Sequence, residues 1–329
     1  MIRLGILGAG AIAKTMAGTI RMMNDNGYDR IQLYGIASRS YAKAEAFAKE
    51  NGVVKAYGSY EEMVNDPDID LVYVATPHSH HYEHAMLCLE HGIPVLVEKA
   101  FTANTEQAVK LLAYAEEHHL LATDAIWTRY QPMRQMINDA VFSGIIGTPK
   151  IVIADLSKPI AHKERIQKPE LAGGVLLDMG IYPINFAEMI FGHPTSVVSV
   201  STNNEYGMDL NDAYLFTFEN GVIGNLYSSA EAFSASDGII HGTLGYIVVR
   251  NVNNPSGMEI YNLDNELIRS IDAPEQLTGY EYEVMETVQA LENGWLECPS
   301  MPHAETIHVM ELMDGIRKQL GVVYPFEKN

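Results

Sequence analysis

The sequence predicts an α/β protein of two domains, and three observations lead to this fold class. With 329 residues, the chain is longer than one typical domain and long enough for two hydrophobic cores. Strand-like and helix-like segments alternate up to about residue 124, which is typical of a parallel sheet with crossover helices. After that point strands joined by tight turns dominate. We therefore expect domains at residues 1–124 and 125–329.

The first stretch of the chain, MIRLGILGAGAIAKTMAG, organises the first domain. An apolar strand, Ile2–Leu7, runs into a turn, and a helix is expected from Ala11 to about Met23. Gly8, Gly10 and Ala13 form the pattern G-x-G-x-x-A between them, which lets a pyrophosphate approach the backbone. The pattern alone is weak, but its place between a strand and a helix predicts a Rossmann dinucleotide-binding domain.

The other strands of the first domain are apolar runs bounded by helix caps and glycines. Ser59 with Glu62, and Asn104 with Gln107, have the spacing of a capping box. We expect the strands at Ile31–Ala37, Val53–Tyr57, Leu71–Ala75, Val95–Glu98 and Leu120–Asp124.

The end of the second strand carries information about the cofactor. An acidic residue there would hydrogen-bond the ribose 2′-hydroxyl of NAD, but this strand ends in Ser38 and Arg39, with Lys43 one helical turn later. A hydroxyl and two cations suit the 2′-phosphate of NADP, so the sequence predicts NADP as the preferred cofactor and NAD as the alternative. Solvated polar side chains at a helix start are the competing interpretation, mainly for Lys43.

A histidine-rich run, TPHSHHYEH, follows the fourth strand. His80 and His84 are four residues apart and share a helix face, but no further ligand at a matching place is evident from the sequence, so we expect no metal. The run instead suits a loop at the carboxyl edge of the sheet, where ligands bind in open α/β folds. Lys99 follows the fifth strand at that same edge, which makes it a candidate for chemistry rather than only a surface lysine.

The second domain is predicted to be α+β, with a large, mostly antiparallel open sheet. Residues 127–130 read as a junction before a helix at about 132–142, and Gly173 and Gly174 introduce a helix that contains Asp178, Gly180 and Tyr182. Strands are expected at 151–156, 196–202, 213–218 and 222–228, the last two forming a hairpin around Asn-Gly. Turns at 254–257 and 264–265 separate further strands, and helices are expected at about 281–292 and 304–320.

Composition excludes several classes of partner. The formal net charge of −20 repels nucleic acid and anionic membranes, and it makes any local basic site informative. The two cysteines, Cys88 and Cys298, fit reduced thiols in a cytoplasmic protein. We expect no membrane span and no cleaved leader, because no apolar run of about 18 residues and no signal-like N-terminus is evident.

Taken together, the motifs resemble those of the glucose-fructose oxidoreductase and inositol dehydrogenase (Gfo/Idh/MocA) family over essentially the whole chain. They are GILGAGAIA, ATPHSHHYEHA, EKA in place of the family's EKP, and GGVLLDMGIYPI in place of GG-x4-D-x-G-x-H. The segments ATDAIWTRYQP and HAETIHVMELMDGIRKQLG resemble the branch of dihydrodiol dehydrogenase and NADP-dependent xylose dehydrogenase.

The resemblance implies catalytic roles for Lys99, Asp178 and Tyr182. It also implies cofactor contacts from Gly8, Gly10, Ala11, Ile12, Ala13, Ser38, Arg39, Lys43, Thr76, Pro77, His78, His81, Glu98, Lys99, Trp127 and, with weaker support, Arg129. Two positions depart from the family pattern. Ala100 replaces a proline that would restrict Lys99, and His78 stands where asparagine is usual.

The expected activity is a NAD(P)-dependent dehydrogenase, an oxidoreductase that moves a hydride between nicotinamide and a sugar, polyol or dihydrodiol-type substrate. A free tyrosine, with a pKa of about 10, is a poor base at neutral pH, so Lys99 is expected to lower the pKa of Tyr182, the acid/base, and to polarise the substrate oxygen, with Asp178 as an orienting or hydrogen-bonding partner. A dinucleotide-sensing regulatory protein and an NAD-assisted isomerase or glycosidase without net redox chemistry are the alternatives. The resemblance also implies a homo-oligomer, a dimer or tetramer, assembled through the second domain's sheet.

Overall fold

The computed structural model describes residues 1–327, which form two compact units. The first unit comprises Met1–Tyr130 and Gln276–Glu311, and the second comprises Gln131–Glu275 and the chain from Leu312 onward. This division differs from the predicted domains, because residues 125–130 and 276–311 group with the first unit rather than with the second.

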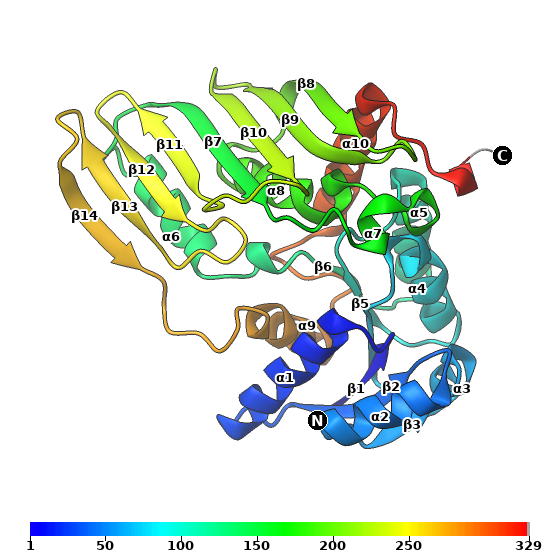
Figure 1. The fold of residues 1–329 in the computed structure, drawn as a ribbon. Helices are drawn as coiled ribbons and strands as arrows, with labels where there is room; N and C mark the ends of the chain where they lie inside the picture. Colours follow the sequence, from blue (N-terminus) through cyan, green and yellow to red (C-terminus); the bar gives the residue numbers. More distant parts are fainter. Residues whose placement is uncertain (328–329) are drawn as a thin grey trace. The chain divides into compact units, whose positions relative to one another are not determined.

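The first unit is built on a six-stranded parallel sheet (Figure 1). Its strands are β1 (Ile2–Leu7), β2 (Ile31–Ala37), β3 (Lys55–Tyr57), β4 (Leu71–Val74), β5 (Val95–Glu98) and β6 (Ala122–Ala125), in the order β3-β2-β1-β4-β5-β6. The predicted strands agree with these bounds to within two residues. This is the Rossmann order, which reverses direction between β1 and β4 and therefore opens a ligand crevice at their carboxyl ends.

The helices of the first unit begin where the sequence signals place them. Ser59 accepts the backbone N–H of Glu62 at 3.1 Å, and Asn104 accepts that of Gln107 at 3.0 Å, which confirms both caps. The helices are α1 (Ala11–Asp25), α2 (Tyr41–Asn51), α3 (Tyr60–Val64), η1 (His78–His80), α4 (His81–Glu90), α5 (Thr105–Glu117), η2 (Trp127–Arg129) and α9 (Glu281–Asn293).

Helix α9 belongs to the core of the first unit although it lies far along the chain. Its Val284 and Val288 are buried in one apolar cluster with Leu4 and Ile6 of β1 and Met16 of α1. Burial of such side chains contributes about 1.5–3 kcal/mol each. The dinucleotide domain is therefore completed by a segment that returns from the end of the chain.

The second unit contains an eight-stranded open sheet, which confirms the predicted fold class (Figure 1). Its order is β14-β13-β12-β11-β7-β10-β9-β8, and every neighbouring pair is antiparallel except β7 with β10. The strands are β7 (Pro149–Ser157), β8 (Pro194–Asn203), β9 (Asp209–Phe218), β10 (Ile223–Ser229), β11 (Gly238–Gly242), β12 (Gly245–Arg250), β13 (Gly257–Asn262) and β14 (Leu267–Asp272).

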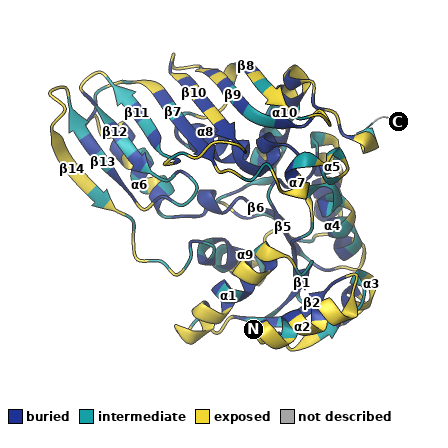
Figure 2. Cartoon of the chain, in the orientation of Figure 1, coloured by how far each residue is buried: buried dark blue, intermediate teal, exposed yellow. Residues whose placement is uncertain are grey.

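Helix α8 (Ile181–Phe191) packs against β7 and β10 of this sheet, and α6 (Met133–Phe142) packs against α8. The chain between β7 and α8 forms short helical turns: α7 (Glu164–Gln167), η3 (Pro169–Leu171) and η4 (Leu176–Gly180). Helix α10 (His303–Leu320) and the turn η5 (Pro325–Glu327) end the described chain. Along β9 and β10, buried and exposed positions alternate (Figure 2), so one face of these two strands is buried and the other stays exposed, whereas β8 is mostly exposed.

One expectation about apolar runs is wrong. The segment Pro169–Phe191 is long and apolar enough to pass a membrane-span test, with a mean hydropathy of 1.2 over its best window. However, 89% of that window is buried inside the protein, as expected of the core helix that packs under the sheet. Cys88 and Cys298 are free and buried, in agreement with the expected reduced thiols.

Three carboxyl groups are buried together at the carboxyl end of the parallel sheet. Glu98 ends β5, Asp124 lies in β6, and α9 supplies Glu283, which is fully buried with neither oxygen hydrogen-bonded within residues 1–327. Burial, with repulsion from Glu98 adding to it and Arg129 opposing it, raises the pKa of Asp124 to about 8. Burial, together with repulsion from Glu98 and Asp124, also raises the pKa of Glu283. Asp124 and Glu283 therefore hold protons at pH values where exposed carboxyls are ionised.

Replacing Asp124 by asparagine should stabilise the protein increasingly as the pH rises. The folded-state pKa of about 8 lies above the ordinary value near 4, so wild type loses stability between pH 4 and 8 while Asp124→Asn does not. Denaturant unfolding at pH 5, 6.5 and 8 should show a difference in unfolding free energy that grows by about 1 kcal/mol per pH unit. A difference that stays constant with pH would contradict the buried, protonated carboxyl.

Candidate functional site

The glycine turn after β1 is held close to the neighbouring strands. Gly8 has φ 99° and donates its N–H to the carbonyl of Ala37 at 3.0 Å. A Cβ at Gly8 would lie 2.7 Å from the carbonyl oxygen of Ala75, which no side chain tolerates. Glycine is therefore required where β1 passes between the ends of β2 and β4.

The amino end of α1 is open to a ligand. Gly10 caps the helix without a side-chain hydrogen bond, and a Cβ built there would meet nothing within 4 Å. The first N–H groups of a helix have no partner within it, so those of Ala11, Ile12 and Ala13 suit the pyrophosphate of a dinucleotide. Ala13 itself is fully buried in the cluster that contains Leu4 and Ile6, as its place in the motif requires.

The end of β2 carries the predicted phosphate-binding side chains. Ser38 is buried, while Arg39 and Lys43 are exposed on the loop and first turn of α2. Among the residues that the structure describes, neither cation forms an ion pair. Both remain available for an anionic ligand at this edge.

The loop after β4 is organised by hydrogen bonds to Thr76. The Thr76 hydroxyl lies 3.0 Å from Nδ1 of His84, and burial, with a smaller effect of His80, lowers the pKa of His84 to about 4. His84 is therefore neutral at neutral pH. Pro77 is exposed and begins η1, and His78 is half-buried with its ring centroid 5.6 Å from that of His81.

The His81 side chain is held by the protein's own backbone, and its predicted contact with the cofactor stays a prediction. Its ring is 1% exposed, with Nδ1 2.8 Å from the carbonyl oxygen of Ala100 and Nε2 2.8 Å from that of Thr76. Both ring nitrogens face the protein's own backbone, so the side chain ties the loop after β4 to the loop after β5. Burial lowers the pKa of His81 to about 4, although the carbonyl contacts oppose that shift.

The histidine run also places a carboxylate beside its imidazoles, which the sequence did not make evident. Ligand atoms of His80, Glu83 and His84 lie within 4.8 Å of one another. The Glu83 side chain is 74% exposed, and Nδ1 of His84 already bonds Thr76. Exposed acidic groups are common beside histidines without a metal, so we assign no metal here.

Lys99 lies where the sequence placed it, directly after β5. Its backbone N–H donates to the Glu98 carboxylate at 3.1 Å, and Glu98 also accepts the hydroxyl of Tyr73. The Lys99 side chain is half-buried, and the peptide bond from Lys99 to Ala100 is cis. The lysine thus follows a buried, hydrogen-bonded carboxylate at the ligand edge of the sheet.

Trp127 and Arg129 lie in the turn after β6 and are both buried. The indole of Trp127 stacks on the ring of Tyr280, with centroids 4.0 Å apart and planes 4° apart. The Arg129 guanidinium forms a 2.7 Å ion pair with Glu305 and is only 2% exposed. These contacts fix the turn to the returning segment 276–311, and contacts of either residue with a cofactor stay a prediction.

In the second unit, Asp178 and Tyr182 lie on different kinds of helix. Asp178 is in the π-helical turn η4, whereas Tyr182 is in the first turn of α8, and each is 7% exposed. The single helix predicted to contain both residues is therefore divided between a π turn and an α-helix. Such turns are frequent at functional sites.

Strand β9 holds this π turn in place. The carboxylate of Asp209 accepts the backbone N–H of Leu176 at 2.7 Å and occupies the space where a Cβ of Gly174 would lie. The hydroxyl of Tyr214 fills the corresponding space at Gly180. Glycines at these two positions of the motif therefore admit side chains of β9, which was not predictable from the sequence.

Arg165 was not predicted as a site residue, but it contacts Asp178 directly. Its Nη2 lies 2.8 Å from Oδ2 and its Nε 3.4 Å from Oδ1 of that carboxylate. The only signal in the sequence is a cluster of cations in the loop around it. An Arg–carboxylate pair of this kind holds the carboxylate in its ionised form.

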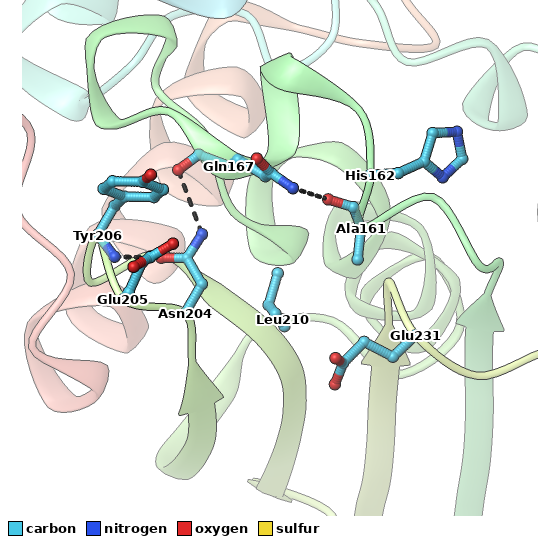
Figure 3. Close-up of a pocket in the computed structure, with 8 residues that line it drawn as sticks. All are labelled: Ala161, His162, Gln167, Asn204, Glu205, Tyr206, Leu210 and Glu231. Carbon is cyan, nitrogen blue, oxygen red and sulfur yellow. Dashed lines mark hydrogen bonds between the residues drawn. The ribbon is translucent and has the colours of Figure 1, made fainter.

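The loop that carries Arg165 is fastened to the β8–β9 hairpin beside a cavity of about 320 Å³ (Figure 3). Gln167 donates to the carbonyl of Ala161 at 2.9 Å, and Asn204 donates to the carbonyl of Gln167 at 3.2 Å. Tyr206, at the tip of the hairpin, donates its N–H to Asn204 at 2.9 Å. The loop that carries Arg165 is thus held by hydrogen bonds on both sides of Gln167.

Comparisons with known proteins agree with this arrangement. The family model described as "Oxidoreductase family, NAD-binding Rossmann fold" matches residues 2–124, and the Gfo/Idh/MocA C-terminal domain model matches residues 130–248. The NADP-dependent D-xylose 1-dehydrogenase of Hypocrea jecorina is 35% identical, with 98% of this chain and 93% of that protein covered. The trans-1,2-dihydrobenzene-1,2-diol dehydrogenase of Bos taurus is 29% identical over 100% of this chain and 99% of that protein.

Solved structures share the fold. A 3-ketoreductase from Actinomadura kijaniata, solved with NADP and TDP-benzene, superposes with a TM-score of 0.86 at 24% identity, covering 97% of both chains. A levoglucosan dehydrogenase solved with NADH and levoglucosan gives a TM-score of 0.85 at 18% identity and covers 97% of both chains. With matches to both family models and to relatives along the full chain, this protein belongs to the Gfo/Idh/MocA family and is an NAD(P)-dependent oxidoreductase.

Proposed function

We propose that this enzyme transfers a hydride between NADP and a hydroxyl or carbonyl carbon of a sugar, polyol or dihydrodiol. The observation that carries the proposal is the pairing of an uncapped helix end after Gly8 with free cations at Arg39 and Lys43. Relatives named for D-xylose and dihydrodiol substrates support the substrate range. When bound, the nicotinamide supplies the hydride acceptor or donor.

Three side chains take the chemical roles in this proposal. Tyr182 moves the proton of the substrate hydroxyl, for which the pKa of its phenol must be lowered from about 10. Lys99 supplies the positive charge that stabilises the phenolate and polarises the substrate oxygen. Asp178, ionised beside Arg165, accepts a hydrogen bond from a neighbouring substrate hydroxyl.

The direct test is a panel of sugars, polyols and dihydrodiols followed by absorbance of reduced nicotinamide with each cofactor. Hydride transfer predicts net cofactor reduction with at least one panel member. A regulatory sensor would bind cofactor without turnover. An isomerase or glycosidase would convert substrate with no net change in reduced cofactor.

Removal of the Arg39 side chain should weaken NADP binding selectively. The guanidinium is exposed and unpaired, so its loss should cost about 1.5 to 3 kcal/mol of charge-assisted contact with the 2′-phosphate. Calorimetric titration of Arg39→Ala should show NADP affinity lower by about ten-fold or more, with NAD affinity nearly unchanged. Lys49→Ala on the same helix is the control, and an unchanged NADP affinity in Arg39→Ala would refute the assignment.

Tyr182→Phe should remove most turnover while leaving cofactor affinity intact. The substitution deletes one phenolic oxygen from a 7% exposed residue, so packing hardly changes. A positioned acid/base contributes about 10² to 10⁴ in rate, so kcat should fall by that order with little change in KM, and Lys99→Met should have a comparable effect. Tyr246→Phe on β12 serves as the control. If Tyr182→Phe retains kcat within a few-fold, the tyrosine is structural.

We also propose that the exposed face of β8, β9 and β10 forms a homo-oligomer interface. Val198, Leu215 and Ile223 are 60%, 52% and 50% exposed and lie on the neighbouring strands β8, β9 and β10. Val198 and Asn225 lie on either side of Leu215, and Ile223 pairs with Thr217, two residues further along β9. Contiguous apolar surface of this kind marks an interaction site in soluble proteins.

Light scattering should therefore give at least twice the monomer mass of 36.5 kDa. Leu215→Glu should dissociate the oligomer without unfolding the chain, because it places a charge at the centre of the face. Leu263→Glu, which changes an exposed leucine beyond β13, should not. A monomeric wild type at micromolar concentration would end the proposal.

A further inference from the structure

We infer that the substrate carries an oxyanion, a carboxylate or a phosphate ester, and that Arg165 binds it. The inference rests on the proposed function and narrows its substrate class. It assigns Arg165 as a specificity-determining residue of the second unit, beside the Asp178 carboxylate that the proposed chemistry uses.

The orientation of Arg165 leaves part of its guanidinium unused. Nε and Nη2 point to the Asp178 carboxylate, at 3.4 and 2.8 Å. Nη1 has no hydrogen-bond partner among the described residues, and the side chain is 42% exposed while Asp178 is 9% exposed. One guanidinium can bridge two carboxylates through its two edges, so the free edge presents donors to a second anion next to Asp178.

The backbone that carries Arg165 is fixed, which holds the free edge of its guanidinium in place. A Cβ at Gly173 would lie 2.7 Å from the carbonyl oxygen of Ile166, so the residue after Arg165 packs directly on the glycine pair of the motif. Ile166 itself is fully buried, and Gln167 is hydrogen-bonded on both sides (Figure 3). An anion-binding side chain on a rigid segment loses little entropy on binding.

The segment that carries Arg165 is basic in sequence, whereas the chain as a whole is acidic. Four of the chain's 22 lysines and arginines lie between Lys158 and Lys168, against one acidic residue, Glu164, in a chain of net charge −20. Lys168 is neutralised by Glu164 one turn away. Lys158 and Lys163 are exposed and form no ion pair within residues 1–327.

The cations of this segment favour an anionic ligand over a neutral one. The acidic body repels an anion at long range, and a cluster of cations beside Arg165 offsets that repulsion locally. A neutral sugar would gain nothing from Lys158 and Lys163. The competing explanation is that Arg165 only neutralises the buried Asp178, and the test below separates the two.

The test compares matched neutral and anionic sugars on the NADP-loaded enzyme. D-glucose is set against D-glucuronate and D-glucose 6-phosphate, and D-galactose against D-galacturonate, by calorimetric binding and by turnover. Inorganic phosphate is titrated as a probe that needs no sugar specificity. The variants are Arg165→Met and, as the control, Lys168→Met, whose ammonium is already paired.

We expect an anionic member of at least one pair to bind more tightly than its neutral partner, and Arg165→Met to reduce its affinity or kcat/KM by about 10- to 100-fold, mainly through KM. Because Arg165 also contacts Asp178, kcat should fall alike for both partners, whereas the affinity for the neutral partner should change less than three-fold. Lys168→Met should leave both partners unchanged. The two anionic arms distinguish a carboxylate from a phosphate substrate.

If Arg165→Met reduced the binding affinity equally for the neutral and the anionic partner, Arg165 would only orient Asp178, and the inference would be overturned. The inference would also be overturned if anionic sugars and phosphate bound no more tightly to wild type than to Arg165→Met. Turnover of neutral sugars alone would leave the proposed function standing and refute the inference. Anion binding that depends on Arg165, without hydride transfer to any substrate, would support the inference and refute the proposed function.

Discussion

The close passage of Gly8 over the carbonyl of Ala75 is the constraint on which the first unit depends. The missing Cβ lets the end of β1 lie against both β2 and β4, at the point where the strand order reverses. Because the chain turns so tightly there, α1 begins at once with its first N–H groups uncapped at the edge of the sheet. Ligand binding at this edge is a consequence of the strand order and the turn, not of a separate loop.

The second unit achieves the same precision by a different route. Its π turn is clamped from β9, where Asp209 receives the N–H of Leu176, and Tyr214 lies against Gly180. Asp209 is buried beside Asp212, whose pKa burial and repulsion from Asp209 raise to about 9, so a buried proton accompanies the clamp. Asp178 lies in a turn that is held by β9, which limits the reorganisation that its proposed catalytic role would require.

The sequence was sufficient for most strands and helices of the first unit and for its Rossmann class, because apolar periodicity, capping boxes and the glycine turn are local signals. It was insufficient where packing decides. No local pattern shows that Val284 and Val288 pack in the core of the first unit. None shows that the Asp209 carboxylate occupies the space beside Gly174 where a Cβ would lie. Arg165 was not predicted as a site residue, and the partners of His81 were not foreseen, for the same reason: these partners are a carboxylate and carbonyls that only the fold brings near.

Electrostatics links these observations. A chain of net charge −20 would repel both a dinucleotide phosphate and an anionic substrate, so each must be bound where the charge is locally reversed. The two proposed places are the exposed Arg39 and Lys43 after β2, and the segment from Lys158 to Lys168 that follows β7 beside Asp178. Within residues 1–327, Arg39, Lys43, Lys158 and Lys163 form no ion pair. A cluster of such cations after a strand is therefore a candidate anion-binding place in this acidic chain.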